Sequence, residues 1–170
     1  TPLSNFEANM DYRDVEDPSI YFTLNAREDF NNIKKGDKFL IWTTTPWCIP
    51  GNLAIAIGKD IEYSRVSMND GFYWIASQRL QELEGFEIEI ISSCNGNELI
   101  GASYIPAYDE YENLYSDGAF RLIHSDDTNT ESGSGLVSQA PAYGETDFYA
   151  LKNSGIDVIA DPVTPVSYTH

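Results

Sequence analysis

The chain has 170 residues, of which 42% are hydrophobic and 13% aromatic, so it can form one globular domain with its own core. Ten Lys and Arg against 27 Asp and Glu give a net charge of −17. This balance argues against a free-standing nucleic-acid-binding protein, because basic side chains make most contacts with phosphates.

Cysteine content and hydropathy indicate the compartment. Cys48 and Cys94 are too few for a disulfide framework and lie in no CxxC motif, which favours a reducing, cytoplasmic location. No apolar run approaches the length of a membrane span, and no signal-peptide pattern opens the chain. Because the sequence starts at Thr1 without an initiator Met, we expect a fragment of a longer protein.

The first half of the chain predicts mainly strands. Alternating, β-rich residues predict a strand over 19–26, and a turn then leads to a buried strand over 39–45. Small apolar residues predict another short strand over 52–58. Residues 61–77 indicate a β-hairpin, because the Asn-Asp-Gly run at 69–71 tolerates a positive φ.

The second half predicts three strands and two helices. Gly85 is a stop signal after a predicted helix over 78–84, and Gly155 is one after a predicted helix over about 143–153. Glu145 and Asp147, in the first turn of the second helix, suit the positive end of its dipole. We therefore predict an α+β fold, with a closed or nearly closed β-rich barrel and short helices at its rim. In chain order the elements are a helix over 78–84, strands over 86–92, 120–125 and 136–139, and a helix over about 143–153.

The run WTTTPWCIPGNLAIAI at 42–57 is unusual for a strand. Three threonines at 43–45 have an ordinary interpretation as β-branched residues in a sheet. A functional interpretation is a row of hydroxyls at a strand end, which binds a ligand or orients water. Pro46 and Pro50 favour the second interpretation, because they fix a loop and cannot continue a sheet ladder.

Asp147 is a second candidate. Its simplest interpretation is a helix-start residue, but the Gly-containing turn PAYGETD places it where a carboxylate can face the mouth of a pocket. A buried carboxylate needs a cationic or hydrogen-bonding partner, and the ammonium group of a ligand would serve.

Other reactive residues indicate less. His124 and His170 are the only histidines, so we expect neither a His-based triad nor a zinc site. Trp42, Trp47 and Trp74 are most simply core residues. The sequence contains no dinucleotide, P-loop, zinc-protease or nucleophile-elbow motif.

Two stretches together resemble the editing domain inserted into isoleucyl-tRNA synthetases. They are the threonine-rich run at 42–57 and GSGLVSQAPAYGETDF at 133–148. Residues 4–22 and 97–106 also resemble that domain, in the same order. The Thr-Thr-Thr-Pro-Trp run is similar to the isoleucyl branch, whereas the valyl and leucyl branches carry Arg in a TTRP-type run. The resemblance implies a single barrel-like editing domain over 1–170, with short peripheral helices, excised from a larger synthetase.

The resemblance also implies a hydrolytic proofreading activity. The parent enzyme attaches isoleucine to its tRNA but also activates valine, which is smaller by one methylene, and binding alone discriminates poorly against a missing methylene. A second site then hydrolyses valine mischarged on isoleucine tRNA, with valyl-adenylate as a further candidate substrate. That site excludes isoleucine by size, because overfilling a rigid pocket is costly.

The resemblance implies a catalytic set of Thr44, Thr45 and Asp147. The two threonines, with Thr43 behind them, would surround the aminoacyl ester and the terminal adenosine and hold the attacking water. Asp147 would bind the α-ammonium of the substrate through a charge-assisted contact. A strong general base is unnecessary, because an aminoacyl ester is already activated.

Four further residues would bind substrate. Trp47 and Cys48 would form the wall against the small side chain, and Asn52 would lie among the polar groups near the ester. Cys48 stands where the family usually has Thr, and Ser138 stands where it usually has His, a residue that helps reject isoleucine. The smaller Ser138 implies either a looser sieve or a space refilled by another side chain.

The resemblance implies no cofactor in this domain. It implies a parent enzyme that uses ATP and Mg²⁺, with a zinc site in another domain of the parent as a further option. The implied partners are the 3′ end of aminoacylated isoleucine tRNA and the catalytic and tRNA-binding domains of the parent, without a membrane. Ser138 motivates an alternative, in which an inactive domain is kept as a structural or tRNA-positioning insertion. Editing for a different aliphatic synthetase is a third option.

Overall fold

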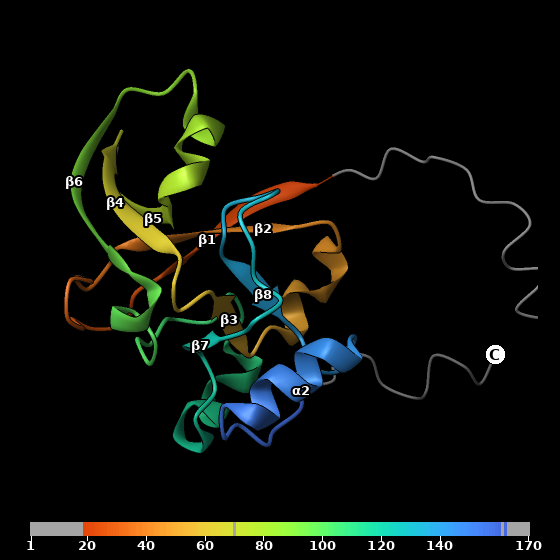
Figure 1. Cartoon of the computed structure of the whole chain (residues 1–170). Helices are drawn as coiled ribbons and strands as arrows, with labels where there is room; N and C mark the ends of the chain where they lie inside the picture. The colour runs from red at the N-terminus through yellow and green to blue at the C-terminus, as the bar shows by residue number, and fades with distance from the viewer. Residues whose placement is uncertain (1–18, 70, 161, 163–170) are drawn as a thin grey trace, which may run out of the picture.

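The computed structural model describes residues 19–69, 71–160 and 162 (Figure 1). These residues form eight strands, one α-helix and four 3₁₀-helical segments. The elements are β1 (Ile20–Asn25), β2 (Lys38–Thr43), η1 (Pro46–Gly51), β3 (Ala54–Ile57), β4 (Glu62–Met68), β5 (Gly71–Ala76), η2 (Ser77–Leu83), β6 (Ile88–Asn95), η3 (Gly96–Glu98), η4 (Asp109–Asp117), β7 (Arg121–His124), β8 (Val137–Gln139) and α2 (Glu145–Asn153).

The strands form one mixed sheet in the order β6-β4-β5-β2-β8-β3-β7, and β1 pairs with β2. Strand β2 joins the two halves of this sheet. Its first residues pair in parallel with β5, and Trp42 near its end pairs in parallel with Val137 of β8. In Figure 1 the β4, β5 and β6 strands lie on one side of β2, while β3, β7 and α2 lie on the other. The sequence stretch 42–57 therefore begins where the two halves meet.

The core follows from the strand pattern. Strand β2 is buried along most of its length, because Phe39 and Ile41 belong to the larger core cluster while Leu40, which alternates with them, belongs to a second cluster. Asp37, which is 3% exposed, accepts two hydrogen bonds of 2.8 Å from Arg65 and one of 3.0 Å from Trp74 Nε1. This buried ion pair ties the start of β2 to β4 and β5.

All the predicted strands are confirmed, with ends that differ by at most three residues. Strand β2 ends at Thr43 rather than at residue 45, because the Thr43 hydroxyl accepts a hydrogen bond from the backbone N–H of Thr45 and turns the chain. The predicted hairpin is present as β4 and β5, with Asn69 at a φ of 46°; Asp70 lies outside the described residues.

The helix predictions are partly wrong. The predicted helix over 78–84 is the 3₁₀ segment η2, and α2 starts at Glu145 instead of residue 143, because Tyr143 N–H bonds the Ala140 carbonyl and holds a turn before the helix. The 3₁₀ segments η1, η3 and η4 were not predicted. Gly85 and Gly155, at φ of 99° and 79°, follow the two predicted helices as expected.

The sheet is a half-barrel rather than a closed one, since no β6–β7 pairing occurs among the described residues. Short helices lie around it, which confirms the predicted α+β class. Within the described ranges, no helix is both long and apolar enough to span a bilayer.

Candidate functional site

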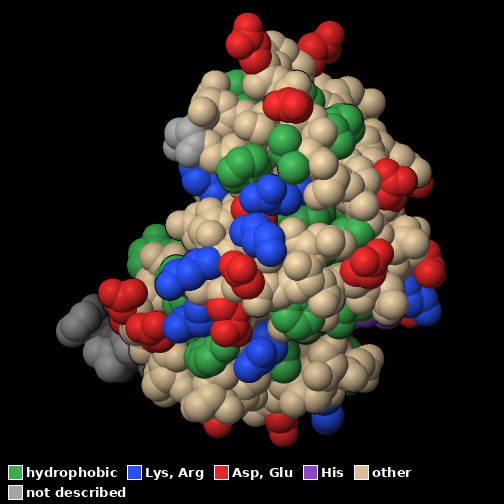
Figure 2. All heavy atoms as spheres, turned by 90° about the vertical axis from the view of Figure 1, so that its left-hand side faces the viewer, with side chains coloured by type: hydrophobic (Ala, Val, Ile, Leu, Met, Phe, Trp, Pro, Cys, Tyr) green, Lys and Arg blue, Asp and Glu red, His purple; other side chains and the backbone are tan. Residues whose placement is uncertain are grey.

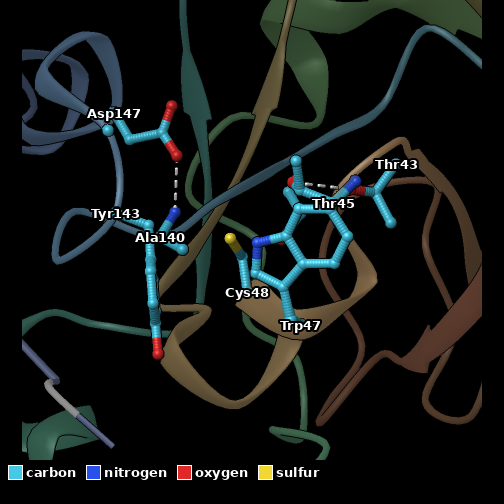
Figure 3. Close-up of a pocket in the computed structure, with 9 residues that line it drawn as sticks. Thr43, Thr45, Trp47, Cys48, Ala140, Tyr143 and Asp147 are labelled. Carbon is cyan, nitrogen blue, oxygen red and sulfur yellow. Dashed lines mark hydrogen bonds between the residues drawn. The ribbon is translucent and has the colours of Figure 1, made fainter. Parts of the chain in front are cut away.

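Two distant parts of the sequence line one cavity of about 290 Å³. One part is the end of β2 with the 3₁₀ segment η1, and the other is β8 with the turn that leads into α2 (Figure 3). The sheet brings them together because β8 pairs with both β2 and β3. The lining residues are Thr43, Thr45, Trp47, Cys48, Ser138, Ala140, Tyr143, Gly144 and Asp147.

The threonine side of the cavity is a fixed turn. Thr43 Oγ1 accepts a hydrogen bond of 3.0 Å from Thr45 N and lies 3.3 Å from Thr45 Oγ1. Pro46 starts η1 immediately afterwards, and Cys48 N–H bonds the Thr45 carbonyl. Proline suits the first position of a helical turn, since it needs no amide hydrogen there. Two hydroxyls are thus held together at one edge of the cavity.

Asp147 supplies the charge on the opposite side. It lies in the first turn of α2, and its Oδ2 accepts a hydrogen bond of 2.8 Å from Ala140 N–H (Figure 3). Burial raises the pKa of the Asp147 carboxyl, and the bond from Ala140 offsets part of that rise. Within the described residues Oδ1 accepts no hydrogen bond, so it is available to a cationic ligand.

A buried polar chain lies under the cavity. Asn52, which is 6% exposed, donates hydrogen bonds from Nδ2 to the Ala54 carbonyl at 2.8 Å and to Ser138 Oγ at 2.9 Å. Its Oδ1 accepts a hydrogen bond from the hydroxyl of Tyr104, which is inaccessible to solvent. Asn52 therefore contacts the cavity only through Ser138.

The structure brings together six of the eight residues predicted for the site: Thr43, Thr45, Trp47, Cys48, Ser138 and Asp147. Asn52 lies directly behind them, whereas Thr44 is exposed and does not line the cavity. The interpretation of Trp47 as a core residue is wrong, since its side chain is 67% exposed at the cavity rim. The roles assigned to these residues stay predictions.

Sequence reasoning missed three lining residues: Ala140, Tyr143 and Gly144. The Gly-containing turn before Asp147 was expected to place the carboxylate at a pocket mouth, but its own residues were not expected to line the pocket, and the helix was predicted to start already at about residue 143. A Cβ on Gly144 would lie 3.3 Å from Asp147 Cγ, so the glycine leaves room for the carboxylate. Ala140 contributes through its backbone N–H, which no residue type reveals.

Metal ligands are not assembled in this part of the chain. Among the described residues, no group of three or more His, Cys, Asp or Glu side chains is placed to hold a metal ion. The cavity instead offers three aliphatic hydroxyls, from Thr43, Thr45 and Ser138, together with one carboxylate, one thiol and aromatic walls. Such a set can bind an ammonium group and position water at a polar bond.

No family model matches the chain. It is 41% identical over 98% of its length to the isoleucine–tRNA ligase of Protochlamydia amoebophila, and 41% identical over 94% to that of Bdellovibrio bacteriovorus. It is 32% identical over 97% of its length to the cytoplasmic isoleucine–tRNA ligase of Saccharomyces cerevisiae. The chain spans only 15–16% of the length of these relatives, so it is homologous to one segment of them.

Solved structures of synthetase editing domains share the fold. The GlLeuRS-CP1 crystal structure superimposes with a TM-score of 0.65 at 15% identity, covering 87% of this chain and 69% of that one. The editing domain of P. knowlesi cytosolic leucyl-tRNA synthetase gives a TM-score of 0.64 at 11% identity, with coverages of 79% and 62%. At such identities the likeness establishes the fold alone.

Proposed function

We propose that this chain, which is homologous to one segment of isoleucine–tRNA ligases and has the fold of synthetase editing domains, hydrolyses valine mischarged on isoleucine tRNA. The observation that carries the proposal is the single cavity shared by the threonine turn and Asp147. These groups lie about 100 residues apart in sequence, and each occurs in one of the two signature stretches.

Asp147 would recognise the α-ammonium of the aminoacyl group. Its carboxylate is half-buried and already fixed by Ala140 N–H, so little ordering is needed when the ammonium arrives. A charge-assisted hydrogen bond in a partly dry site is stronger than one between neutral groups. The ammonium would also lower the raised pKa of Asp147, because a nearby positive charge favours the ionised form.

The threonine turn would position the ester and the attacking water. In the reaction the water oxygen attacks the ester carbonyl carbon, and the bond to the ribose oxygen breaks, which releases valine and an uncharged tRNA. Thr43 and Thr45 hold their hydroxyls in a fixed arrangement, as positioning and charge stabilisation require. This chemistry needs no cofactor in the domain.

The walls would supply the discrimination. Trp47 and Cys48 face Tyr143 and Asp147 across the cavity, and a fixed wall penalises an extra methylene by about 1–3 kcal/mol.

We extend the proposal to valyl-adenylate as a further substrate. The partners in this proposal are the 3′ end of isoleucine tRNA and the catalytic and tRNA-binding domains of a parent synthetase, in the cytoplasm.

The first test is deacylation of valyl-tRNA for isoleucine by Asp147→Ala. We expect kcat/KM to fall about 10- to 100-fold, because a hydrogen bond to a charged group contributes about 1.5–3 kcal/mol. Glu145→Ala is the matched control, since this exposed carboxylate lies in the same helical turn outside the cavity and its loss should leave the rate unchanged.

An Asp147→Ala rate equal to that of the unmutated protein would refute the assigned role. A second candidate function, a structural or tRNA-positioning insertion, is motivated by Ser138 at the position where the resembling family usually has His. If the unmutated protein and both variants all remain at the background rate, this second function replaces the first.

A further inference from the structure

The chain of hydrogen bonds from Tyr104 through Asn52 to Ser138 fixes which atom donates at every step. A backbone carbonyl can only accept, so the contact with the Ala54 carbonyl places Asn52 Nδ2, and not Oδ1, on that side. Both Nδ2 hydrogens are then used, one toward Ala54 and one toward Ser138 Oγ. Oδ1 receives the Tyr104 hydroxyl, and burial raises the pKa of that phenol well above its ordinary value, which keeps it protonated.

Ser138 is consequently a hydrogen-bond donor with its own proton unused. Its oxygen accepts from Asn52, and no acceptor for its hydroxyl hydrogen lies among the described residues. Ser138 lines the cavity, so the open direction for this hydrogen is toward a ligand. Ser138 is half-buried, so a ligand that enters the cavity displaces water from this donor, and a ligand without an acceptor at that point leaves the donor unpaired.

The position of Ser138 relative to Asp147 indicates which part of a ligand it would meet. Ser138 and Ala140 are two residues apart at the end of β8, about 7 Å along an extended chain, and both line the cavity. Ala140 N–H holds the Asp147 carboxylate. An amino acid whose ammonium lies at Asp147 therefore has its β-carbon within reach of Ser138.

We propose that Tyr104 and Asn52 orient Ser138 as a donor in the cavity floor, and that the cavity thereby prefers an aminoacyl group with a β-hydroxyl, as in threonine, over valine of the same shape. The inference rests on the proposed editing function and refines its substrate class. Threonine and valine differ by a hydroxyl in place of a methyl, so shape cannot separate them. A site with a fixed donor can, because the analogue without the hydroxyl leaves that donor unpaired.

The test uses the whole chain and two non-hydrolysable probes, the threonyl and valyl amides of 3′-amino-3′-deoxyadenosine, in isothermal titration calorimetry. We expect the unmutated protein to bind the threonyl probe about three- to tenfold more tightly, the range that one net hydrogen bond supplies. Ser138→Ala should bring the affinity ratio to about one. Ser138→Cys, which keeps the size but donates weakly, should give an intermediate ratio.

Tyr104→Phe tests the positioning role without touching the cavity. We expect its affinity ratio to fall toward one, because Asn52 loses the bond that holds it. The matched control is Tyr63→Phe: Tyr63 is equally inaccessible to solvent, and its hydroxyl bonds only the backbone of Gly58 and Gly135. That variant should keep the ratio. A purely structural Tyr104 would weaken both probes equally and leave the ratio unmoved.

Equal affinities for the two probes in the unmutated protein, failure to bind either probe, or an unchanged ratio in Ser138→Ala would each overturn the inference. Hydrolysis of the threonyl and valyl esters of isoleucine tRNA, measured separately, distinguishes failure of this inference from failure of the proposed editing function. Hydrolysis without a threonyl preference in binding rejects this inference alone. A preserved binding preference without hydrolysis of either ester supports it and rejects editing.

Discussion

At the scale of single residues, Asp147 shows how the environment changes the behaviour of a predicted side chain. Its sequence context predicted a helix-start carboxylate, and it does lie in the first turn of α2. The cavity wall additionally shields it partly from water, and this partial burial raises the pKa of its carboxyl. A carboxylate that is disfavoured in the empty cavity is well suited to bind a cation, because the ligand relieves the cost.

Asp147→Asn should therefore separate stability from function. The folded-state pKa lies above the unfolded value, so protonation of Asp147 stabilises the fold at low pH and this contribution is lost as pH rises through the raised pKa. An Asn at this position can still accept the hydrogen bond from Ala140 N–H. Because the amide does not titrate, its contribution to the free energy of unfolding does not fall as pH rises. We expect the free energy of unfolding of the variant, relative to the unmutated protein, to be higher at pH 8 than at pH 4.

Urea unfolding at both pH values checks this expectation, with Glu145→Gln as the exposed control that should show no such trend. A variant that loses relative stability as pH rises would contradict it.

The same Asp147→Asn variant should lose deacylation, because an amide cannot form the ion pair with the substrate ammonium.

At the scale of elements, the short strand β8 places half of the cavity. It has only three residues and is held between β2 and β3 by close approach of the preceding loop to β5. Gly135 is central to that approach: its φ is 75°, and a Cβ there would lie 2.5 Å from Ala76 Cβ. Its carbonyl also accepts the Tyr63 hydroxyl at 2.7 Å.

Gly135→Ala should lower the free energy of unfolding by about 2–5 kcal/mol, the sum of the left-handed backbone cost and overpacking in the core. Gly155→Ala is the control, because its φ is 79° but no heavy atom lies within 4 Å of the added Cβ. That change should cost only about 1–2 kcal/mol. Chemical denaturation of both variants measures the difference, and equal losses would show that the approach to Ala76 contributes nothing.

At the scale of the whole molecule, charge sets the expected contact with tRNA. Lys and Arg side chains gather in the middle of the face in Figure 2, among and beside acidic side chains. The net charge of −17 remains, so few cations are available to release counterions from a tRNA backbone. Under the proposed function, most of the tRNA binding would have to come from basic surfaces outside this chain.

We expect the chain alone to bind isoleucine tRNA with a dissociation constant above about 10 μM at about 0.15 M salt, with a shallow dependence on salt concentration. Fluorescence anisotropy of labelled tRNA, titrated between about 50 and 200 mM salt, measures both quantities. Strong binding that weakens steeply with salt would contradict the expectation.

The sequence predicted the strands well because alternation and apolar runs report which residues a sheet buries. It predicted the helical segments less well: η1 contains two prolines and was interpreted as a fixed loop, and the η2 pattern fits an α-helix and a 3₁₀-helix equally. Among site residues, the threonines and Asp147 could be predicted by residue type, whereas Ser138 was predicted only through the resemblance. Ala140 and Gly144 could not, because one acts through its backbone and the other through the absence of a side chain.

The sequence by itself determined the β-rich α+β class, the positions of the strands along the chain, the net charge, and the two stretches that resemble an editing domain. Only the tertiary structure decided that these stretches share one cavity, that Trp47 is exposed, and that Tyr104 reaches Ser138 through Asn52. The physical reason is that local patterns report the burial and backbone preference of each segment. The approach of β8 to β2 and β3, by contrast, depends on pairing and packing between residues far apart in the chain.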